Sequence, residues 1–313
     1  MKADVAFEMF EQSGREMATT PEARVLNRSL TLSRIADRKT AATPALLSKW
    51  TPDAFPDDLP APVFLVGFPR SGTTLTEQVL ASHPNVITAE EKPLIARLER
   101  ELTTRFPGDD LPAILPRLDA DDIGALRAGY WRQAESLMET SLTDKVFIDK
   151  MPLNIIELDL INVVFPDARV IVVLRDPRDV CLSNFMQRFV LNSAMVNFLR
   201  WEQTVEFYDR TMDFWLHIRP MITLPFIEVR YEDMVDDLEA AARRLLDFIG
   251  VAWDEQVLRY DEQAGRKFIA TPSAAAVSKP IYRSSVGRWR SYESQVGRVA
   301  EKLRPYLAAF GYT

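Results

Sequence analysis

Cysteine, histidine and uninterrupted apolar runs are scarce in this sequence. It contains one cysteine, Cys181, and two histidines, His83 and His217. A single cysteine excludes an intrachain disulfide and a cysteine-rich zinc site, and two histidines argue against a histidine-rich metal site. No apolar run approaches the roughly 20 residues of a membrane-spanning helix. The segment MKADVAFEMFEQSGREM carries acids throughout, unlike a signal peptide, so we expect a cytoplasmic protein without a metal.

Positive charge is also in short supply. The chain has 38 lysines and arginines against 45 acidic residues, a net charge of −7. A general nucleic-acid binder needs a basic surface, so that class is disfavoured, although a local basic pocket is still allowed. Apolar residues make up 47% of the 313 residues, which suits a globular protein with a sizeable core.

The pattern of apolar residues predicts three parts of the chain. Residues 1–50 have helical spacing and form an N-terminal helical extension, and residues 51–62, with four prolines, form a linker. In the main domain, residues 63–313, short aliphatic runs alternate with helical patterns. We predict strands at 63–66, 146–149, 168–175 and within 224–234, and helices at 73–83, 152–165, 177–190 and 236–250. This alternation predicts a doubly wound parallel α/β sheet flanked by helices, with ligands at the carboxyl ends of the strands.

A strand, a glycine turn and a helix follow one another in VFLVGFPRSGTTLTEQVLASHPNV. Gly67 and Gly72 have the G-x-x-x-x-G spacing of nucleotide phosphate loops, whose glycines let backbone N–H groups approach an anion. Thr73 and Thr74 fall at the helix N-terminus, which favours negative charge. Thr73 replaces the lysine that normally reaches the phosphates of a nucleoside triphosphate. Arg70 instead offers a planar fork that suits a phosphodiester or sulfonate-like group.

A glycine turn without any ligand is the alternative interpretation of this stretch. The complete P-R-S-G-T-T string between a strand and a helix favours an anion site over that alternative. Together with the alternating pattern, it predicts an α/β fold of the P-loop NTPase-like class.

Two strings, GFPRSGTT and VIVVLRDPRDVCLS, resemble the sulfotransferases, which use 3′-phosphoadenosine 5′-phosphosulfate (PAPS) as donor and release 3′-phosphoadenosine 5′-phosphate (PAP). The resemblance is strongest to bacterial sulfotransferases attached to tetratricopeptide repeats and to tyrosylprotein sulfotransferases. It extends through DKMPLN, VRYEDMV and SKPIYRSSVGRW and covers about residues 60–310. It implies a sulfotransferase that works without a metal.

The resemblance also implies which residues contact the donor. The 5′-phosphosulfate would be held by Arg70, Ser71, Gly72, Thr73 and Thr74. The 3′-phosphate would be held by Arg175 and Ser183. The remaining donor contacts would come from Tyr231, near the nucleotide, and from Ser273 and Arg288, in a late loop that covers the donor. A further arginine of the tyrosylprotein enzymes is replaced by Gln187 here.

Three residues are implied to take part in the chemistry. Glu91 matches a general base that would take the proton of the acceptor, and Lys150 and Arg70 would stabilise charge on the leaving phosphate oxygen. Glu90, its neighbour, is the other candidate base; if the segment is extended, the two side chains point to opposite sides. Other interpretations make Glu90 and Glu91 caps of the following helix, and Lys150 a surface partner of Asp149.

Arg175 likewise has a structural alternative, because it could simply pair with Asp176 or Asp179. The sequence does not identify the acceptor, which could be a hydroxyl or amine of a small molecule, glycan, lipid or peptide. It also leaves the oligomeric state open, including a homodimer. Two other functions compete, a nucleotide kinase or NTPase and a non-catalytic nucleotide-binding protein.

Overall fold

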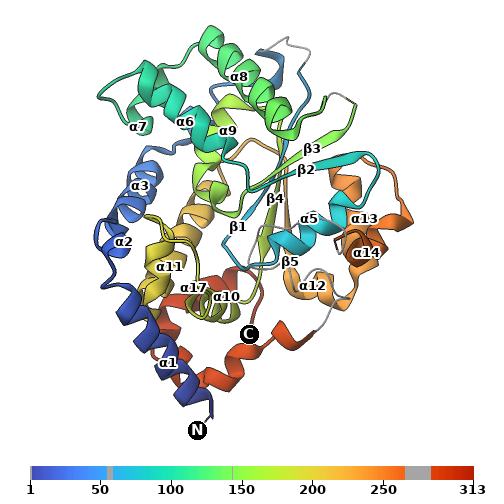
Figure 1. The fold of residues 1–313 in the computed structure, drawn as a ribbon. Coiled ribbons are helices and arrows are strands. Elements are labelled where there is room, and N and C mark those ends of the chain that lie inside the picture. The colour runs from blue at the N-terminus through green and yellow to red at the C-terminus, as the bar shows by residue number, and fades with distance from the viewer. Residues whose placement is uncertain (1, 55–58, 143, 265–282) are drawn as a thin grey trace.

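A fully parallel sheet of five strands forms the centre of the protein. The computed structural model describes residues 2–54, 59–142, 144–264 and 283–313. The strands follow the order β2-β3-β1-β4-β5, so β1 lies in the middle and pairs with both β3 and β4 (Figure 1). Their bounds are β1 Val63–Gly67, β2 Val86–Glu90, β3 Val146–Lys150, β4 Arg169–Leu174 and β5 Phe226–Arg230. The predicted doubly wound parallel sheet is therefore confirmed.

Helices cover both faces of the sheet. The helices between β1 and β5 in the chain are α5 Thr73–Ala81, α6 Leu94–Arg105, α7 Leu111–Ile114, α8 Ala120–Met138, α9 Leu158–Val164, α10 Pro177–Phe185 and α11 Trp201–Ile218. Those after β5 are α12 Tyr231–Asp236, α13 Leu238–Ile249, α14 Tyr260–Ala264, α16 Glu293–Gly297 and α17 Ala300–Ala309. Among the described residues, none of the helices has the length and apolar character needed to cross a membrane.

Side chains of β1 alternate between two apolar clusters. Phe64 and Val66 join the larger cluster, with residues of α8, α9, α10 and α11, whereas Val63 and Leu65 join the smaller one, with residues of α5 and α13. Successive side chains of a strand point to opposite faces, so both faces of this strand are buried. That is why its sequence is apolar throughout rather than alternating.

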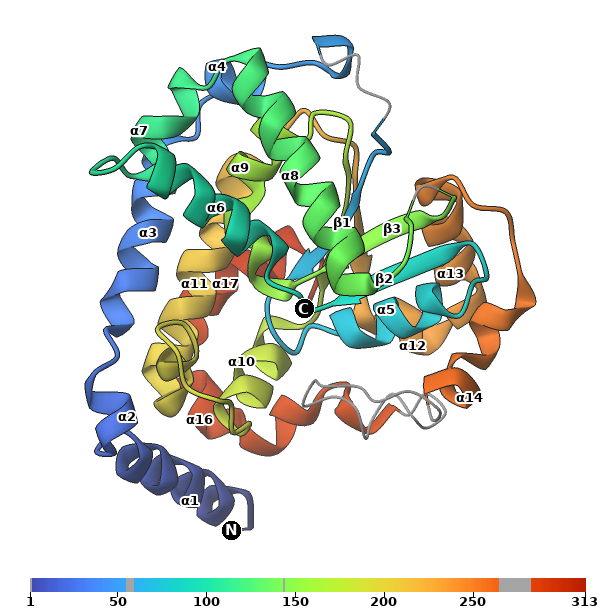
Figure 2. The same cartoon turned by 45° about the horizontal axis from the view of Figure 1, so that its top comes forward.

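The N-terminal helices pack on the larger cluster. They are α1 Lys2–Met17, α2 Pro21–Arg24, α3 Arg28–Ala41 and α4 Pro44–Leu47. Phe7, Ile35 and Leu47 are buried there, and α3 runs beside α11 (Figures 1 and 2). Arg38 of α3 forms buried ion pairs with Asp159 and, at 2.7 Å, with Glu157. These N-terminal helices thus share a core with the sheet.

Three local elements differ from the sequence prediction. Strand β2 has the mixed sequence VITAE, is only partly buried at the sheet edge, and was not among the predicted strands. The predicted helix 152–165 begins as a 3₁₀ turn, Pro152–Glu157, before α9. The predicted helix 177–190 ends at Phe185; beyond it the ring of Phe189 packs 5.2 Å from that of Phe198, and Val190 is exposed.

Candidate active site

The loop between β1 and α5 brings its backbone close to neighbouring strands. Gly72 has φ 110°, and a Cβ atom there would lie 2.7 Å from Cδ2 of Tyr231. A Cβ on Gly67 would lie 2.6 Å from the carbonyl oxygen of Val173. Arg70 adopts φ 68°, a conformation that non-glycine residues rarely adopt. The loop therefore forms a tight cradle that excludes side chains at both glycines, and strain of this kind is concentrated at ligand sites.

A polar atom inside this cradle lacks a protein partner. The hydroxyl oxygen of Ser71 is buried and has no hydrogen-bond partner among the described residues. Thr73 and Thr74, also buried, begin α5, and the first N–H groups of a helix have no partner within the helix. The loop thus offers hydrogen-bond donors and a positive helix end to an anion.

Arg70 and Ser183 meet although they lie on different elements. The Arg70 Nε atom donates a hydrogen bond to the Ser183 hydroxyl at 3.2 Å. Asn184, the next residue of α10, donates from Nδ2 to the carbonyl of Pro69 at 2.8 Å. These two bonds hold the start of the loop against α10. The structure therefore brings together the two strings that the sequence interpretation assigned to opposite ends of one nucleotide.

Arg175 extends this arrangement from the end of β4. Its guanidinium donates to the carbonyl of Arg70 at 3.1 Å and to that of Ser285, and lies 4.7 Å from the ring centre of Tyr231. The Arg175 Nε atom is buried and has no hydrogen-bond partner among the described residues. Asp179 is 3.9 Å away, so the expected ion pair exists but is long. Arg175 thus retains a donor for a ligand.

The carboxylate of Asp179 is engaged with the late segment of the chain. It accepts hydrogen bonds from the backbone N–H groups of Gly287 and Trp289 at 2.7 and 2.8 Å. Burial raises the pKa of Asp179, against the lowering effects of Arg175 and of these two N–H groups. The bonds fix the segment that carries the exposed Arg288 next to α10. Ser273, the other predicted contact of this segment, lies outside the described residues.

Lys150 ends β3 in a completely buried position between two carboxylates. Its Nζ atom lies 2.9 Å from Glu91 Oε1 and 3.1 Å from Glu77 Oε2. Burial by itself lowers the pKa of Lys150, but the two carboxylates outweigh it and raise that pKa above its usual value. The alternative of a surface pair with Asp149 is wrong, because Asp149 accepts a hydrogen bond from the hydroxyl of Tyr130 at 3.0 Å inside the core.

Glu91 follows β2 in a left-handed conformation, with φ 48°. Its N–H donates to the Lys150 carbonyl at 2.9 Å, which continues the pairing of β2 with β3 by one bond. Its side chain is 39% exposed, so one carboxylate of the cluster reaches solvent. The capping alternative is wrong: α6 starts at Leu94 after Pro93, without a side-chain cap. The left-handed turn also means that Glu90 and Glu91 do not form one extended segment.

Glu77 belongs to the site and was missed by sequence interpretation. It lies on α5 with no exposed surface. Burial raises its pKa to about 7 against the lowering effect of Lys150, and the charge of Glu90 raises it further. One signal was available in the sequence, because Glu77 is the sole charged residue of the helical segment TTLTEQVLA and the rest of that segment is apolar or neutral. A charged residue in such a helix requires a buried partner.

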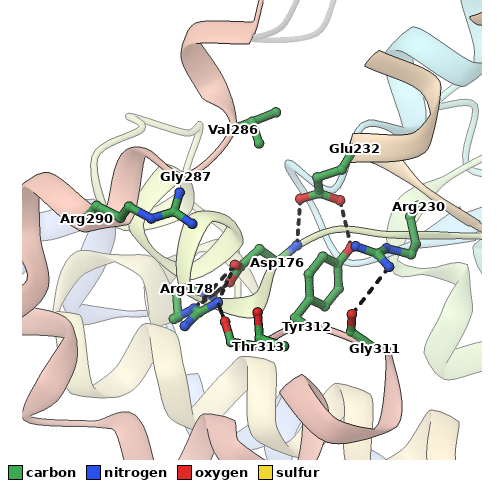
Figure 3. A pocket seen from close by; sticks show the side chains of 10 residues that line it. All are labelled: Asp176, Arg178, Arg230, Glu232, Val286, Gly287, Arg290, Gly311, Tyr312 and Thr313. Carbon is green, nitrogen blue, oxygen red and sulfur yellow. Dashed lines mark hydrogen bonds and ion pairs between the residues drawn. The ribbon is translucent and has the colours of Figure 1, made fainter. Parts of the chain in front are cut away.

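A separate pocket of about 180 Å³ opens beside the ends of β4 and β5 (Figure 3). Several of its charged groups contact one another or neighbouring side chains. Arg178 forms an ion pair with Asp176 at 2.7 Å, and Arg230 lies 4.3 Å from the ring centre of Tyr312. Glu232 accepts hydrogen bonds from the N–H of Asp176 and the hydroxyl of Tyr312.

Candidate side chains lie at the carboxyl ends of all five parallel strands. The loop follows β1, Glu91 follows β2, Lys150 ends β3, Arg175 follows β4 and Tyr231 follows β5. This is the edge at which open α/β sheets bind ligands. Fold and loop together define a P-loop NTPase-like α/β protein with an arginine in the loop and no lysine after its second glycine.

A profile described as the sulfotransferase family matches residues 62–255, and the chain belongs to that family. It is 31% identical over 250 residues to an uncharacterized protein of Aquifex aeolicus (strain VF5); the match covers 78% of this chain but 32% of that protein. The chain therefore spans about a third of the length of that relative.

Two further similarities agree with the family. Protein-tyrosine sulfotransferase 1 of Danio rerio is 26% identical over 279 residues, which cover 84% of this chain and 75% of the relative. Among solved structures, a sulfotransferase domain from the curacin biosynthetic pathway superposes with a TM-score of 0.54 at 18% identity, and the match covers 82% of this chain and 99% of that domain. At this identity the superposition shows the fold alone.

Proposed function

We propose that this protein transfers the sulfuryl group of PAPS to a hydroxyl or amine acceptor. The observation that carries the proposal is the buried Lys150 ammonium paired with the solvent-reaching Glu91 carboxylate, at the same sheet edge as the arginine-bearing loop. A cation and a base at one edge are the two charges that an in-line transfer of a sulfuryl group requires.

The residues around the loop fit the donor. The unpartnered Ser71 hydroxyl and the Arg175 Nε atom are buried donors of the kind that an oxyanion group satisfies, and the glycines leave room for its close approach. We assign the 5′-phosphosulfate to the segment from Arg70 to Thr74. We assign the 3′-phosphate and the nucleotide to Arg175, Ser183, Tyr231, Arg288 and Ser273.

The reaction follows from these positions. The acceptor oxygen bonds to sulfur while the bond between sulfur and the 5′-phosphate oxygen breaks, and that oxygen keeps the electron pair. Glu91 takes the acceptor proton on its carboxylate. Lys150 and Arg70 oppose the negative charge that grows on the leaving oxygen, so most of the rate enhancement comes from positioning and electrostatics. Because the transferred group carries one formal charge, we propose that no divalent metal takes part.

Two other functions make different predictions. A kinase or NTPase needs a loop lysine, and Thr73 stands there instead. A non-catalytic binding protein predicts nucleotide binding without turnover and without any effect of substitutions at Glu91. The names of several relatives indicate protein tyrosine as their acceptor, so a tyrosine-containing peptide is the first acceptor to test; glycans, lipids and small molecules follow.

Calorimetric titration with PAP, beside 5′-AMP and ATP, tests the donor assignment with and without magnesium. We expect PAP alone to bind with a Kd on the order of micromolar, indifferent to magnesium. Arg175→Ala should weaken PAP binding roughly 10- to 100-fold, because a charge-assisted contact is lost. The exposed Arg243, which pairs with Glu239 on α13, provides the control variant Arg243→Ala.

Arg70→Ala should abolish transfer from donor labelled with sulfur-35, because both loop contact and charge stabilisation are lost. Preferential binding of ATP with magnesium would contradict the donor assignment and favour a kinase or NTPase function. Unchanged PAP affinity in Arg175→Ala would show that Arg175 does not bind the 3′-phosphate.

A further inference from the structure

The ammonium of Lys150 has one partner that reaches solvent and one that does not. Glu91 lies on the solvent side, with 39% of its side chain exposed, whereas Glu77 has no exposed side-chain surface. The two carboxylates contact Nζ at 2.9 and 3.1 Å, one from the residue that follows β2 and one from α5. Lys150 is therefore held between an inner and an outer carboxylate at the carboxyl edge of β3.

The inner carboxylate carries a cost that packing does not explain. Taking a carboxylate fully out of water is expensive, and its attraction to one lysine often does no more than offset that penalty. Its neighbours Leu75, Val79 and Leu80 on α5 form part of an apolar cluster, so an apolar residue would suit this helix. A costly buried charge that contacts a residue of the proposed site is a candidate for a functional role.

The charge balance of the three groups changes during the proposed reaction. Before transfer, Lys150 has two carboxylate partners. When Glu91 accepts the acceptor's proton it becomes neutral, and Lys150 would then be a buried cation with no counter-charge if Glu77 were absent. Such a cation tends to lose its proton, since burial lowers the pKa of Lys150.

We propose that Glu77 is a positioning residue that acts through Lys150: it holds the ammonium at the sheet edge and keeps it cationic after Glu91 has taken the proton. The proposal rests on the proposed function. Because Glu77 also shares the ammonium, Glu91 is held less tightly and is available to the acceptor. Burial and Glu90 raise the pKa of Glu77 to about 7, whereas Lys150 from β3 and Thr88 from β2 stabilise its charged form, so that charge depends on Lys150.

A double-mutant cycle tests whether Glu77 acts through Lys150. The variants are Glu77→Gln, Lys150→Met and the double variant, with Glu77→Asp as the conservative replacement. Transfer is measured from donor labelled with sulfur-35 to 2-naphthol and to a tyrosine-containing peptide, and PAP affinity by calorimetry. We expect Glu77→Gln to lower kcat roughly 10- to 100-fold with PAP affinity changed less than about threefold.

The cycle should be non-additive. We expect Glu77→Gln to cause no further loss in the Lys150→Met background, and Glu77→Asp to recover part of the rate because it restores the negative charge. Asp149→Asn is the control: it removes a second buried carboxylate, one on β3 that accepts a hydrogen bond from Tyr130, and should leave kcat unchanged. If Glu77→Gln does not fold, the smaller loss expected of Glu77→Asp carries the comparison.

The outcomes separate the two proposals. Unchanged kcat in Glu77→Gln, or an equal loss with and without Lys150, overturns the role of Glu77 alone. A parent chain that does not bind PAP overturns the proposed function. If the parent binds PAP yet transfers to neither acceptor, unfolding equilibria of the same four proteins decide: coupling of about tenfold or more supports the hold of Glu77 on Lys150, and additive effects overturn it.

Discussion

Arg38 and Lys150 are both buried cations, and their surroundings differ. Arg38, 2% exposed, joins α3 to the segment before and within α9, where its partners Glu157 and Asp159 are themselves almost enclosed. Lys150, with no exposed surface, has the enclosed partner Glu77 and the open partner Glu91. Burial lowers the pKa of each cation, and in both cases the carboxylates outweigh it.

The comparison shows that buried charge alone does not identify a site. In the Arg38 cluster both carboxylates that contact the cation are almost enclosed, and the cluster joins the N-terminal helices to the core. The Lys150 cluster ends in a carboxylate that reaches solvent and whose backbone is left-handed, with φ 48°. An open end and local backbone strain, in addition to burial, distinguish the candidate active site from the structural ion pairs.

Substitution of Glu91, the solvent-reaching carboxylate of the Lys150 cluster, should have the largest effect on the transfer rate. We expect Glu91→Gln to lower kcat by about two to four orders of magnitude, because general-base catalysis is lost. Its unfolding free energy should change by less than about 1 kcal/mol, since an exposed partner contributes little. Steady-state rates and urea unfolding measure the two quantities, and Glu90→Gln is the matched control. Loss in Glu90→Gln and none in Glu91→Gln would move the base to Glu90.

Substitution of the buried Arg38 should lower the free energy of unfolding and leave the transfer rate unchanged. Arg38→Met leaves Glu157 and Asp159 buried without their partner, so the unfolding free energy should fall by about 3–5 kcal/mol. The rate per folded molecule should stay that of the parent. Arg34→Met is the control, because Arg34 pairs with Glu99 and Glu157 from a position that is 39% exposed and should cost about 1 kcal/mol or less. A large loss of rate in Arg38→Met would erase the distinction between the clusters.

The pH dependence of stability reports on a third buried charge. Burial raises the pKa of Asp149 from about 4 to about 7, against the lowering effects of Tyr130 and Lys150. The folded protein therefore keeps a proton that the unfolded chain has already released between these values, so Asp149 costs stability as the pH rises from about 4 to 7. Asp149→Asn should gain on the parent by on the order of 2 kcal/mol over that window. Urea unfolding at several pH values measures it, and parallel curves would contradict the assignment.

A pair at the surface should show the smallest effect. Arg298 and Glu202 lie 2.9 Å apart, with more than half of each side chain exposed. Arg298→Gln should change the unfolding free energy by less than about 0.5 kcal/mol, because solvent screens the pair. Thermal unfolding at low and moderate salt measures the change. A cost above about 1 kcal/mol would show that enclosure is not what separates these pairs.

Local signals in the sequence were enough for the loop and most of the sheet. The aliphatic runs of β1 and β4 and the glycine spacing after β1 predict a strand, a turn and a helix, which depend on neighbouring residues. Glu91 and Lys150 came from resemblance, and the structure brings them into contact. Their roles in catalysis remain predictions.

The features that were missed depend on distant parts of the chain. Glu77 is buried beside Lys150 of β3. The sequence of α5 indicates that this lone charge needs a buried partner, but it does not identify which residue that partner is. Strand β2 was not predicted because its sequence is mixed. Such a sequence is tolerated at the sheet edge, where β2 pairs with β3 alone. The end of α10 at Phe185 was missed as well, and beyond it Phe189 packs against Phe198, a residue distant from α10 in the sequence.

The order of the strands has a consequence for synthesis on the ribosome. β1 and β2 are consecutive in the chain but do not pair with each other; each waits for β3, which begins about 80 residues after β1 ends. At about 5–20 residues per second, the nascent chain exposes an unpaired, wholly apolar β1 for roughly 4–16 s before its first partner is made. Until then the first half of the protein contains no sheet, and the apolar β1 strand is the segment of the growing chain that is exposed to aggregation.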